Sequence, residues 1–143
     1  MRQRLSIIIF SSLYDRIHYA LMMASAAAAT AKPVTIFFTM DALKTLKKPT
    51  SEGIPGWSTL DKNEQDKTPI TKDLEYNGKG IAKIEELLEA CSDFGVKFYI
   101  CETGMKALGL KRTCLRSDLK IGEFGLVSFL KESEDDNGQI VFV

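Results

Sequence analysis

The sequence predicts an α/β fold of three layers, in which a mostly parallel five-stranded sheet carries helices on both faces. Two observations predict it. Continuous apolar runs such as LSIIIF at Leu5–Phe10 and VTIFF at Val34–Phe38 are typical of strands covered on both faces. Helical patterns separate the strands along the chain, and right-handed crossovers then place helices on both sides of the sheet. A length of 143 residues suits one domain, residues 1–143.

The first third of the chain alternates strand and helix. After the strand at Leu5–Phe10, Asp15 can cap a helix that runs to about Thr30, and the Lys32-Pro33 step stops it. The second strand, Val34–Phe38, is followed by a short helix at Met40–Leu46. These elements form the first strand–helix–strand unit of the predicted sheet.

The last third continues the alternation. Apolar residues between Ile81 and Phe94 recur with the spacing of one helical face, and Gly95 closes that helix. The elements expected after it are a strand at Val96–Ile100, a helix at Glu102–Leu108 ended by Gly109, a short strand around Ile121, a helix at Glu123–Lys131, and a strand at Gln139–Val143 after the Asn137-Gly138 turn.

Between these two parts, we expect a long loop at about residues 48–78. The segment contains three of the four prolines, Gly53, Gly56 and the only tryptophan, Trp57. A loop of about thirty residues is unusual inside a compact domain and is commonly functional. A lid over a binding site is one role that it could have.

Composition excludes several classes of function. The chain has 19 basic and 19 acidic residues, so no basic excess indicates a nucleic-acid partner. The apolar run at Tyr19–Ala31 is shorter than the roughly 18 residues that span a membrane, so we expect no membrane span. Three cysteines without a secretory signal favour a reduced, cytoplasmic location.

No metal and no cofactor is expected. The chain has one histidine, His18, and no pair of cysteines with C-x-x-C spacing, so ligands for a closed zinc site are too few. Neither of the glycine-rich phosphate-binding patterns follows a strand. Nucleotide chemistry therefore lacks its usual sequence support.

Cys101 is the candidate catalytic residue. It lies where the strand Val96–Ile100 meets the next helix, and amide groups at a helix start stabilise a nearby anion such as a thiolate. The alternative is that Cys101 is a small hydrophobic residue that closes the strand, because free cysteine is often buried. In open parallel sheets, ligands bind beyond the carboxyl ends of the strands. The expected substrate-binding residues at those ends are Ser11, Ser12, Thr39, Met40, Glu102, Thr103 and Gly104.

The remaining candidates have weaker patterns. Cys91 falls on the apolar face of the Ile81–Phe94 helix and is expected in the core. Cys114 follows Lys111 and Arg112 in a predicted loop, where it could be an exposed thiol or an ordinary loop residue. His18 is expected to be a surface or hydrogen-bonded core residue.

Three segments together resemble the DsrE/DsrF-like family, which has a YchN-like fold and includes sulfur-relay TusD-type proteins. They are SIIIFSSLYDRIHYALMMASAAAATAKPVTIFF, FFTMDALKTLKK and GVKFYICETGMKALGLKRTCLRSDLKIGEFGLVSFL. The resemblance implies homotrimers or hexamers, and a cysteine that carries sulfane sulfur as a persulfide. Only Cys101 matches that position. The sequence departs from the family pattern at Glu102, directly after the cysteine, and at Met40-Asp41-Ala42.

These observations leave three functional hypotheses. The first is a persulfide sulfur carrier or sulfurtransferase that uses Cys101 and exchanges sulfur with donor and acceptor proteins. The second is a non-catalytic oligomeric module that binds a small ligand or a partner, with the Trp57 loop as a lid. The third is a thiol redox sensor that pairs Cys101 with Cys114.

Overall fold

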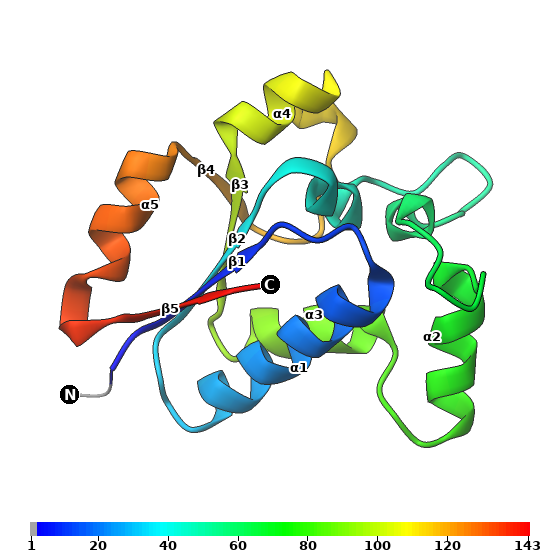
Figure 1. Cartoon of the computed structure of the whole chain (residues 1–143), viewed down its shortest axis with the longest axis horizontal. Coiled ribbons are helices and arrows are strands. Elements are labelled where there is room, and N and C mark those ends of the chain that lie inside the picture. The colour runs from blue at the N-terminus through cyan, green and yellow to red at the C-terminus, as the bar shows by residue number, and fades with distance from the viewer. Residues whose placement is uncertain (1–2) are drawn as a thin grey trace.

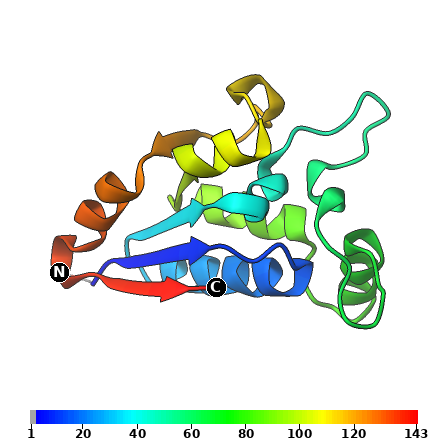
Figure 2. The ribbon, with the colours of Figure 1, turned by 45° about the horizontal axis from the view of Figure 1, so that its top comes forward.

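A computed structural model describes residues 3–143, apart from the side chain of Asp136. Five parallel strands form one sheet in the order β4-β3-β2-β1-β5 (Figures 1 and 2). The predicted α/β class, the five strands and their parallel direction are confirmed. The strands are β1 (Leu5–Ile9), β2 (Val34–Phe38), β3 (Lys97–Cys101), β4 (Ile121–Phe124) and β5 (Gln139–Phe142).

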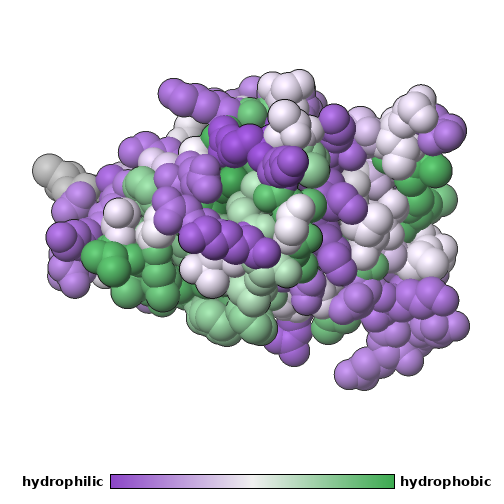
Figure 3. Space-filling model, turned by 90° about the horizontal axis from the view of Figure 1, so that it is seen from above, coloured by the Kyte–Doolittle hydropathy of each residue, from purple (hydrophilic) through white to green (hydrophobic). Residues whose placement is uncertain are grey.

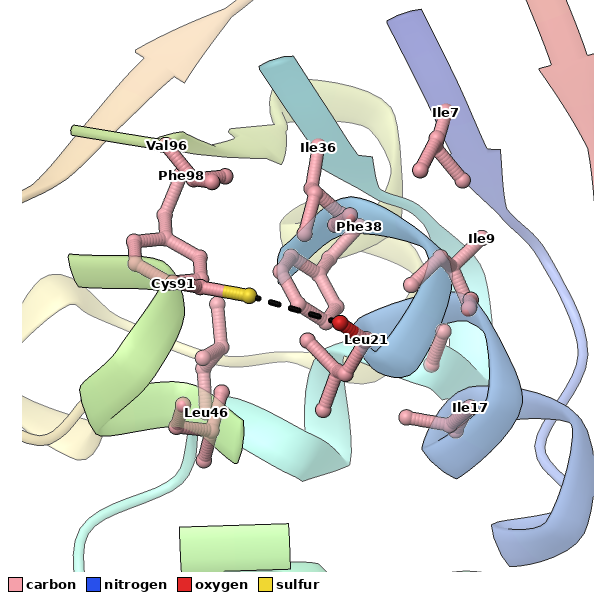
Figure 4. Packing of buried hydrophobic residues seen from close by; sticks show 14 of the residues in the cluster. Ile7, Ile9, Ile17, Leu21, Ile36, Phe38, Leu46, Cys91, Val96 and Phe98 are labelled. Atoms are coloured by element: carbon pink, nitrogen blue, oxygen red, sulfur yellow. Dashed lines mark hydrogen bonds between the residues drawn. The ribbon is translucent and has the colours of Figure 1, made fainter. Parts of the chain in front are cut away.

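Two long helices, α1 (Tyr14–Ala29) and α3 (Ile84–Asp93), cover the first face of the sheet. Alternate strand residues such as Ile7, Ile36 and Phe98 point into this layer, where they form the main core (Figure 4). The alanines of α1 make a smooth surface that lets the helix lie close to the strands and to α3. This layer is the apolar centre of the molecule.

A single helix, α5 (Leu126–Ser133), lies over the second face of the sheet (Figure 1). Its Phe129 is fully buried and stacks on Phe37 of β2, with ring centroids 4.5 Å apart. Its Glu132 accepts a hydrogen bond from Thr35 and lies 3.7 Å from Arg4. One aromatic stack and one polar cluster therefore hold α5 to the strands.

The segment expected as a loop at about residues 48–78 is not continuous loop. A short 3-10 helix, η2 (Gly56–Thr59), and the α-helix α2 (Pro69–Gly78) interrupt it. The missed signal is the Thr68-Pro69 step: the Thr68 hydroxyl accepts a hydrogen bond from the Thr71 amide, and proline has the right φ for the first helical turn.

Buried polar and aromatic contacts anchor this segment to α1. The Tyr14 hydroxyl donates to Asp73, which also accepts from the Ile84 amide at 2.8 Å. Trp57 is 5% exposed, and its ring lies 6.0 Å from that of Tyr14. Burial, followed by the hydrogen bond to Asp73, raises the pKa of Tyr14 far above its ordinary value. The segment is thus part of the packed structure.

Two other predicted boundaries were wrong. Glu123 belongs to β4, because it pairs with Ile100 of β3, and α5 begins only after Gly125. The α3 helix begins at Ile84, because the Glu86 side chain accepts a hydrogen bond at 3.1 Å from the amide of Lys83, the residue before the helix. Sequence periodicity cannot locate such ends, since the deciding hydrogen bonds are local and specific.

Short helices complete the chain. They are η1 (Met40–Leu46), α4 (Glu102–Leu108), η3 (Arg112–Cys114) and η4 (Asp135–Asn137), of which α4 is an α-helix and the others are 3-10 helices. The α4 helix stands at the top of Figure 1, above the carboxyl ends of the strands. None of the helices within residues 3–143 has the length and apolar character needed to cross a membrane.

Candidate functional site

Cys101 belongs to β3 and to the junction that follows it. It is the last residue of the strand, where it pairs with Phe124 of β4, and its extended backbone caps α4. The sequence predicted a cysteine directly after the strand, so the observed position differs by one residue. The strand–cysteine–helix junction itself is present.

The Cys101 side chain lies on the second face of the sheet and is 6% exposed. It packs in a small cluster with Phe37 of β2 and Phe129 of α5. Tyr99 and Phe124 border this cluster, and their rings stack with centroids 3.9 Å apart. The cover over the thiol is therefore aromatic and is provided in part by α5.

Two expected substrate-binding residues, Met40 and Gly104, meet beside this junction. A Cβ placed on Gly104 would lie 2.7 Å from the Met40 nitrogen and 2.7 Å from a methyl carbon of Leu43. Glycine at residue 104 therefore lets α4 approach the end of β2. Met40 itself has a φ of 50°, which is a strained left-handed conformation for a methionine.

Glu102 and Thr103 are exposed at the start of α4. A Cβ built on Gly125 would lie 3.6 Å from a carboxylate oxygen of Glu102. The Glu102 carboxylate therefore lies near the beginning of α5. A negative charge there is stabilised by the amide groups of the first turn of α5.

The three residues at the ends of β1 and β2 have partners inside the chain. The Thr39 amide donates to the Ile9 carbonyl at 3.0 Å, and the Ser11 hydroxyl accepts from the Leu13 amide at 3.1 Å. The Ser12 hydroxyl donates to the carboxylate of Asp61. Ser12 thus faces a carboxylate that comes from the segment once expected to be loop.

The other two cysteines have different surroundings. Cys91 is fully buried and its thiol contacts the Leu21 carbonyl at 3.5 Å (Figure 4), and burial raises its pKa to about 12. The predicted core position of Cys91 is confirmed. Cys114 is partly exposed, and its carbonyl accepts from the Lys48 amide at 2.9 Å. His18 is buried, with its Nε2 atom 2.8 Å from the Ala82 carbonyl, as expected for a hydrogen-bonded core histidine.

The family model described as "DsrE/DsrF-like family" matches residues 3–135 of this chain. The chain belongs to the DsrE/DsrF-like family. The family is one that is generally related to sulfur relay. This DsrE/DsrF-like chain is 26% identical to the uncharacterized protein YrkE of Bacillus subtilis strain 168, over 93% of this chain and 92% of that protein. Its fold is similar to that of MTH1491, a protein of unknown function from Methanobacterium thermoautotrophicum, with a TM-score of 0.60, 12% identity and 99% coverage of both chains.

Sequence reasoning missed a hollow of about 430 Å³ beside α4 in this DsrE/DsrF-like protein. Its charged lining is mixed: Lys106, Lys111 and Arg112 are basic, and Glu102 and Glu123 are acidic. The Arg112 side chain donates to the Ile121 carbonyl at 2.7 Å. The signal in the sequence was the Lys-Arg step at 111–112. Within residues 3–143, no group of three or more potential metal ligands comes together.

Proposed function

We propose that this DsrE/DsrF-like protein is a persulfide sulfur carrier whose reactive group is the Cys101 thiol. Membership of the DsrE/DsrF-like family supports the proposal, because this family is generally related to sulfur relay. The single observation that carries it is the position of a free cysteine where β3 meets α4, at the carboxyl edge of a parallel sheet. Cys91 is a poor candidate because its thiol is sealed in the core.

The chemistry needs no metal and no organic cofactor. The Cys101 thiolate attacks the outer, sulfane sulfur of a donor persulfide, R–S–SH, and forms a new S–S bond. The donor's S–S bond breaks, and the donor leaves as a thiolate. The carried sulfur is then the outer atom of a Cys101 persulfide, and an acceptor thiolate removes it by the same step in reverse.

Transfer requires access to a thiol that is 6% exposed. The cover over Cys101 includes Phe129, so displacement of α5 from Phe37 opens the second face. Gly125, directly before α5, is a suitable hinge because glycine has few conformational restrictions. Opening of a small peripheral helix costs less than global unfolding.

The residues at the strand ends would flank the sulfur in transfer. They are Ser11, Ser12, Thr39, Met40, Glu102, Thr103 and Gly104. The hollow beside α4, whose lining carries charges of both signs, would contact a polar surface of a donor or acceptor protein near the thiol. We further propose that the protein acts in the reducing cytoplasm as a homotrimer or hexamer, and its three unpaired cysteines agree with that compartment.

Incubation of the native protein with thiosulfate or a glutathione persulfide, followed by peptide mass spectrometry, tests the proposal. We expect a mass increase of one sulfur atom on the peptide that contains Cys101, and its loss after treatment with a thiol. Cys101→Ser abolishes the increase, whereas the matched variant Cys114→Ser retains it. Sulfur found only on Cys114, or on no cysteine, contradicts the proposal.

A second candidate function is a non-catalytic module that binds a partner. The burial of Cys101 favours it, because a thiol packed between aromatic rings is also what a core position requires. In that case Cys101→Ser leaves partner binding intact. The redox-sensor hypothesis stays a prediction, and oxidation of the native protein followed by peptide mapping for a Cys101–Cys114 disulfide tests it.

A further inference from the structure

A second hollow, of about 540 Å³, lies beside β3 and β4 and has no acidic side chain among the described residues that line it. We call it the β3/β4 hollow, and its charged residues are Lys97 and Lys120. Both lysines are exposed, and neither forms an ion pair within residues 3–143. The hollow beside α4 differs, because basic and acidic side chains both line it. The β3/β4 hollow therefore favours an anionic ligand.

Strand register places this hollow on the same face of the sheet as the Cys101 thiol. Lys97, Tyr99 and Cys101 occupy every second position of β3, so their side chains point to the second face. Gly122 pairs with Tyr99, and Phe124 pairs with Cys101. The Tyr99 side chain lines the hollow and also borders the cluster around the thiol. The β3/β4 hollow and the thiol are thus neighbours along one strand.

Two contacts fix the Tyr99 ring between the hollow and the thiol. The ring stacks on that of Phe124, with centroids 3.9 Å apart and planes 7° apart. It also lies against Gly122, where an added Cβ would be 2.6 Å from a ring carbon of Tyr99. Glycine at residue 122 therefore makes room for the ring over β4. A ring held in this way gives the hollow a firm wall, so a ligand does not have to order it on binding.

The size and the chemistry of the β3/β4 hollow fit a small molecule. Sites for small ligands are concave, measure about 300–1,000 Å³ and contain a few polar groups that orient the ligand. Figure 3 shows hydrophobic side chains gathered along the lower left edge of the molecule, the side on which β5 lies. β4 and β5 are opposite edges of the sheet, so this apolar surface is not part of the hollow. Charge is therefore the main feature by which the hollow selects a ligand.

The spacing along β3 sets the length of a ligand that reaches both the lysines and the thiol. Lys97 and Cys101 are the first and last residues of β3, so their Cα atoms are roughly 13 Å apart. An extended tripeptide spans up to roughly 10 Å. The flexible four-carbon side chain of lysine can cover the remainder. A thiol of tripeptide size with carboxylates therefore has suitable length and charge.

We propose that the β3/β4 hollow binds the carboxylates of a low-molecular-weight thiol of peptide size, and that the persulfide of this thiol is the sulfur donor. The inference rests on the proposed function of Cys101. Lys97 and Lys120 hold the carboxylates, and displacement of α5 lets the sulfane sulfur reach the thiolate. The Cys101 thiolate bonds to that sulfur, the donor's S–S bond breaks, and the donor leaves as a thiolate. The step consumes no oxidant and no reductant.

Calorimetric titration of the native protein with S-methylglutathione tests the site. This probe has both carboxylates, but its capped sulfur can neither give nor accept sulfane sulfur. We expect saturable binding, which the double substitution Lys97→Gln, Lys120→Gln weakens by about tenfold or more. Both lysines are exposed, so the substitutions leave the fold intact, which circular dichroism verifies. Lys79→Gln is the matched control and should bind as the wild type does, because Lys79 is an exposed lysine at the end of α2.

The diethyl ester of S-methylglutathione, which lacks both negative charges, should not bind. The site is overturned if the native protein does not bind S-methylglutathione at millimolar concentration, if the ester binds equally well, or if Lys79→Gln weakens binding as much as the double substitution does. Persulfide formation on Cys101 from glutathione persulfide is measured separately by mass spectrometry. Binding without persulfide formation contradicts the sulfur-carrier function and leaves the site intact, whereas persulfide formation without binding overturns the site alone.

Discussion

Removal of the Phe129 ring should expose Cys101 to reagents. Phe129 is fully buried and stacks on Phe37 with ring centroids 4.5 Å apart and planes 15° apart. Truncation of a buried phenylalanine to alanine costs about 3–5 kcal/mol. Because Phe129 is the main apolar contact between α5 and the sheet, we expect most of this cost to fall on the docking of α5 instead of on the whole fold.

A cost of about 3 kcal/mol on docking raises the open population of α5 by about 150-fold. If iodoacetamide reaches Cys101 only in the open state, its rate of alkylation in Phe129→Ala should rise by about the same factor. Quenched labelling of the native protein, followed by peptide mass spectrometry, measures each cysteine separately. Cys91 should stay unlabelled, because it lies on the buried side of α3, in the main core on the first face of the sheet.

Lys131→Ala, a change at an exposed residue of the same helix, is the control and should leave the rate at Cys101 unchanged. An unchanged rate at Cys101 in Phe129→Ala would refute the view that α5 controls access to the thiol. Equal acceleration at Cys91 and Cys101 would also refute it, because global unfolding would then be the route of labelling.

Three further predictions concern stability. Ala31 has a φ of 66° in the turn that ends α1, where the Lys32 amide donates to the Ala27 carbonyl, and this left-handed conformation favours glycine. Ala31→Gly should therefore raise the free energy of unfolding in urea by about 0.5–1 kcal/mol, and a decrease would contradict this account. Gly104→Ala forces Met40 or Leu43 to move and should lower the free energy of unfolding by about 1–3 kcal/mol. Gly78→Ala is the control and should cause no loss, because no atom lies within 4 Å of the added Cβ. Equal effects of the two substitutions would contradict the packing argument. Folding raises the pKa of Cys91 from an ordinary 9.0 to about 12, so above pH 9 the unfolded chain loses this proton before the folded chain does. The free energy of unfolding should therefore fall by up to about 1.4 kcal/mol per pH unit as the pH rises above 9. Cys91→Ala should flatten this slope in urea titrations at alkaline pH, and an unchanged slope would show that other groups cause it.

Much of the fold was readable from the sequence because local patterns reflect burial directly. The runs at Leu5–Phe10 and Val34–Phe38 predicted buried strands, and both strands are present within one residue of the expected ends. The apolar spacing after Ile81 predicted α3, although the hydrogen bond from the Lys83 amide to the Glu86 side chain sets its start at Ile84. The α2 helix was missed because proline-rich, polar sequence is typical of loops, and the Thr68 cap is a small signal beside it.

The sequence by itself determined the five strands, the helices α1, α3, α4 and α5 between them, and the place of Cys101 at the junction of β3 and α4. Side-chain periodicity and glycine or proline breaks reveal such features, because they depend on residues that are near neighbours in the sequence. Only the tertiary structure decided that α5 covers the thiol, that Asp61 meets Ser12 and that Gly104 meets Met40. These contacts join residues that lie 28 to 64 positions apart, so they depend on how the layers pack, and no pattern within a short window of sequence records that packing.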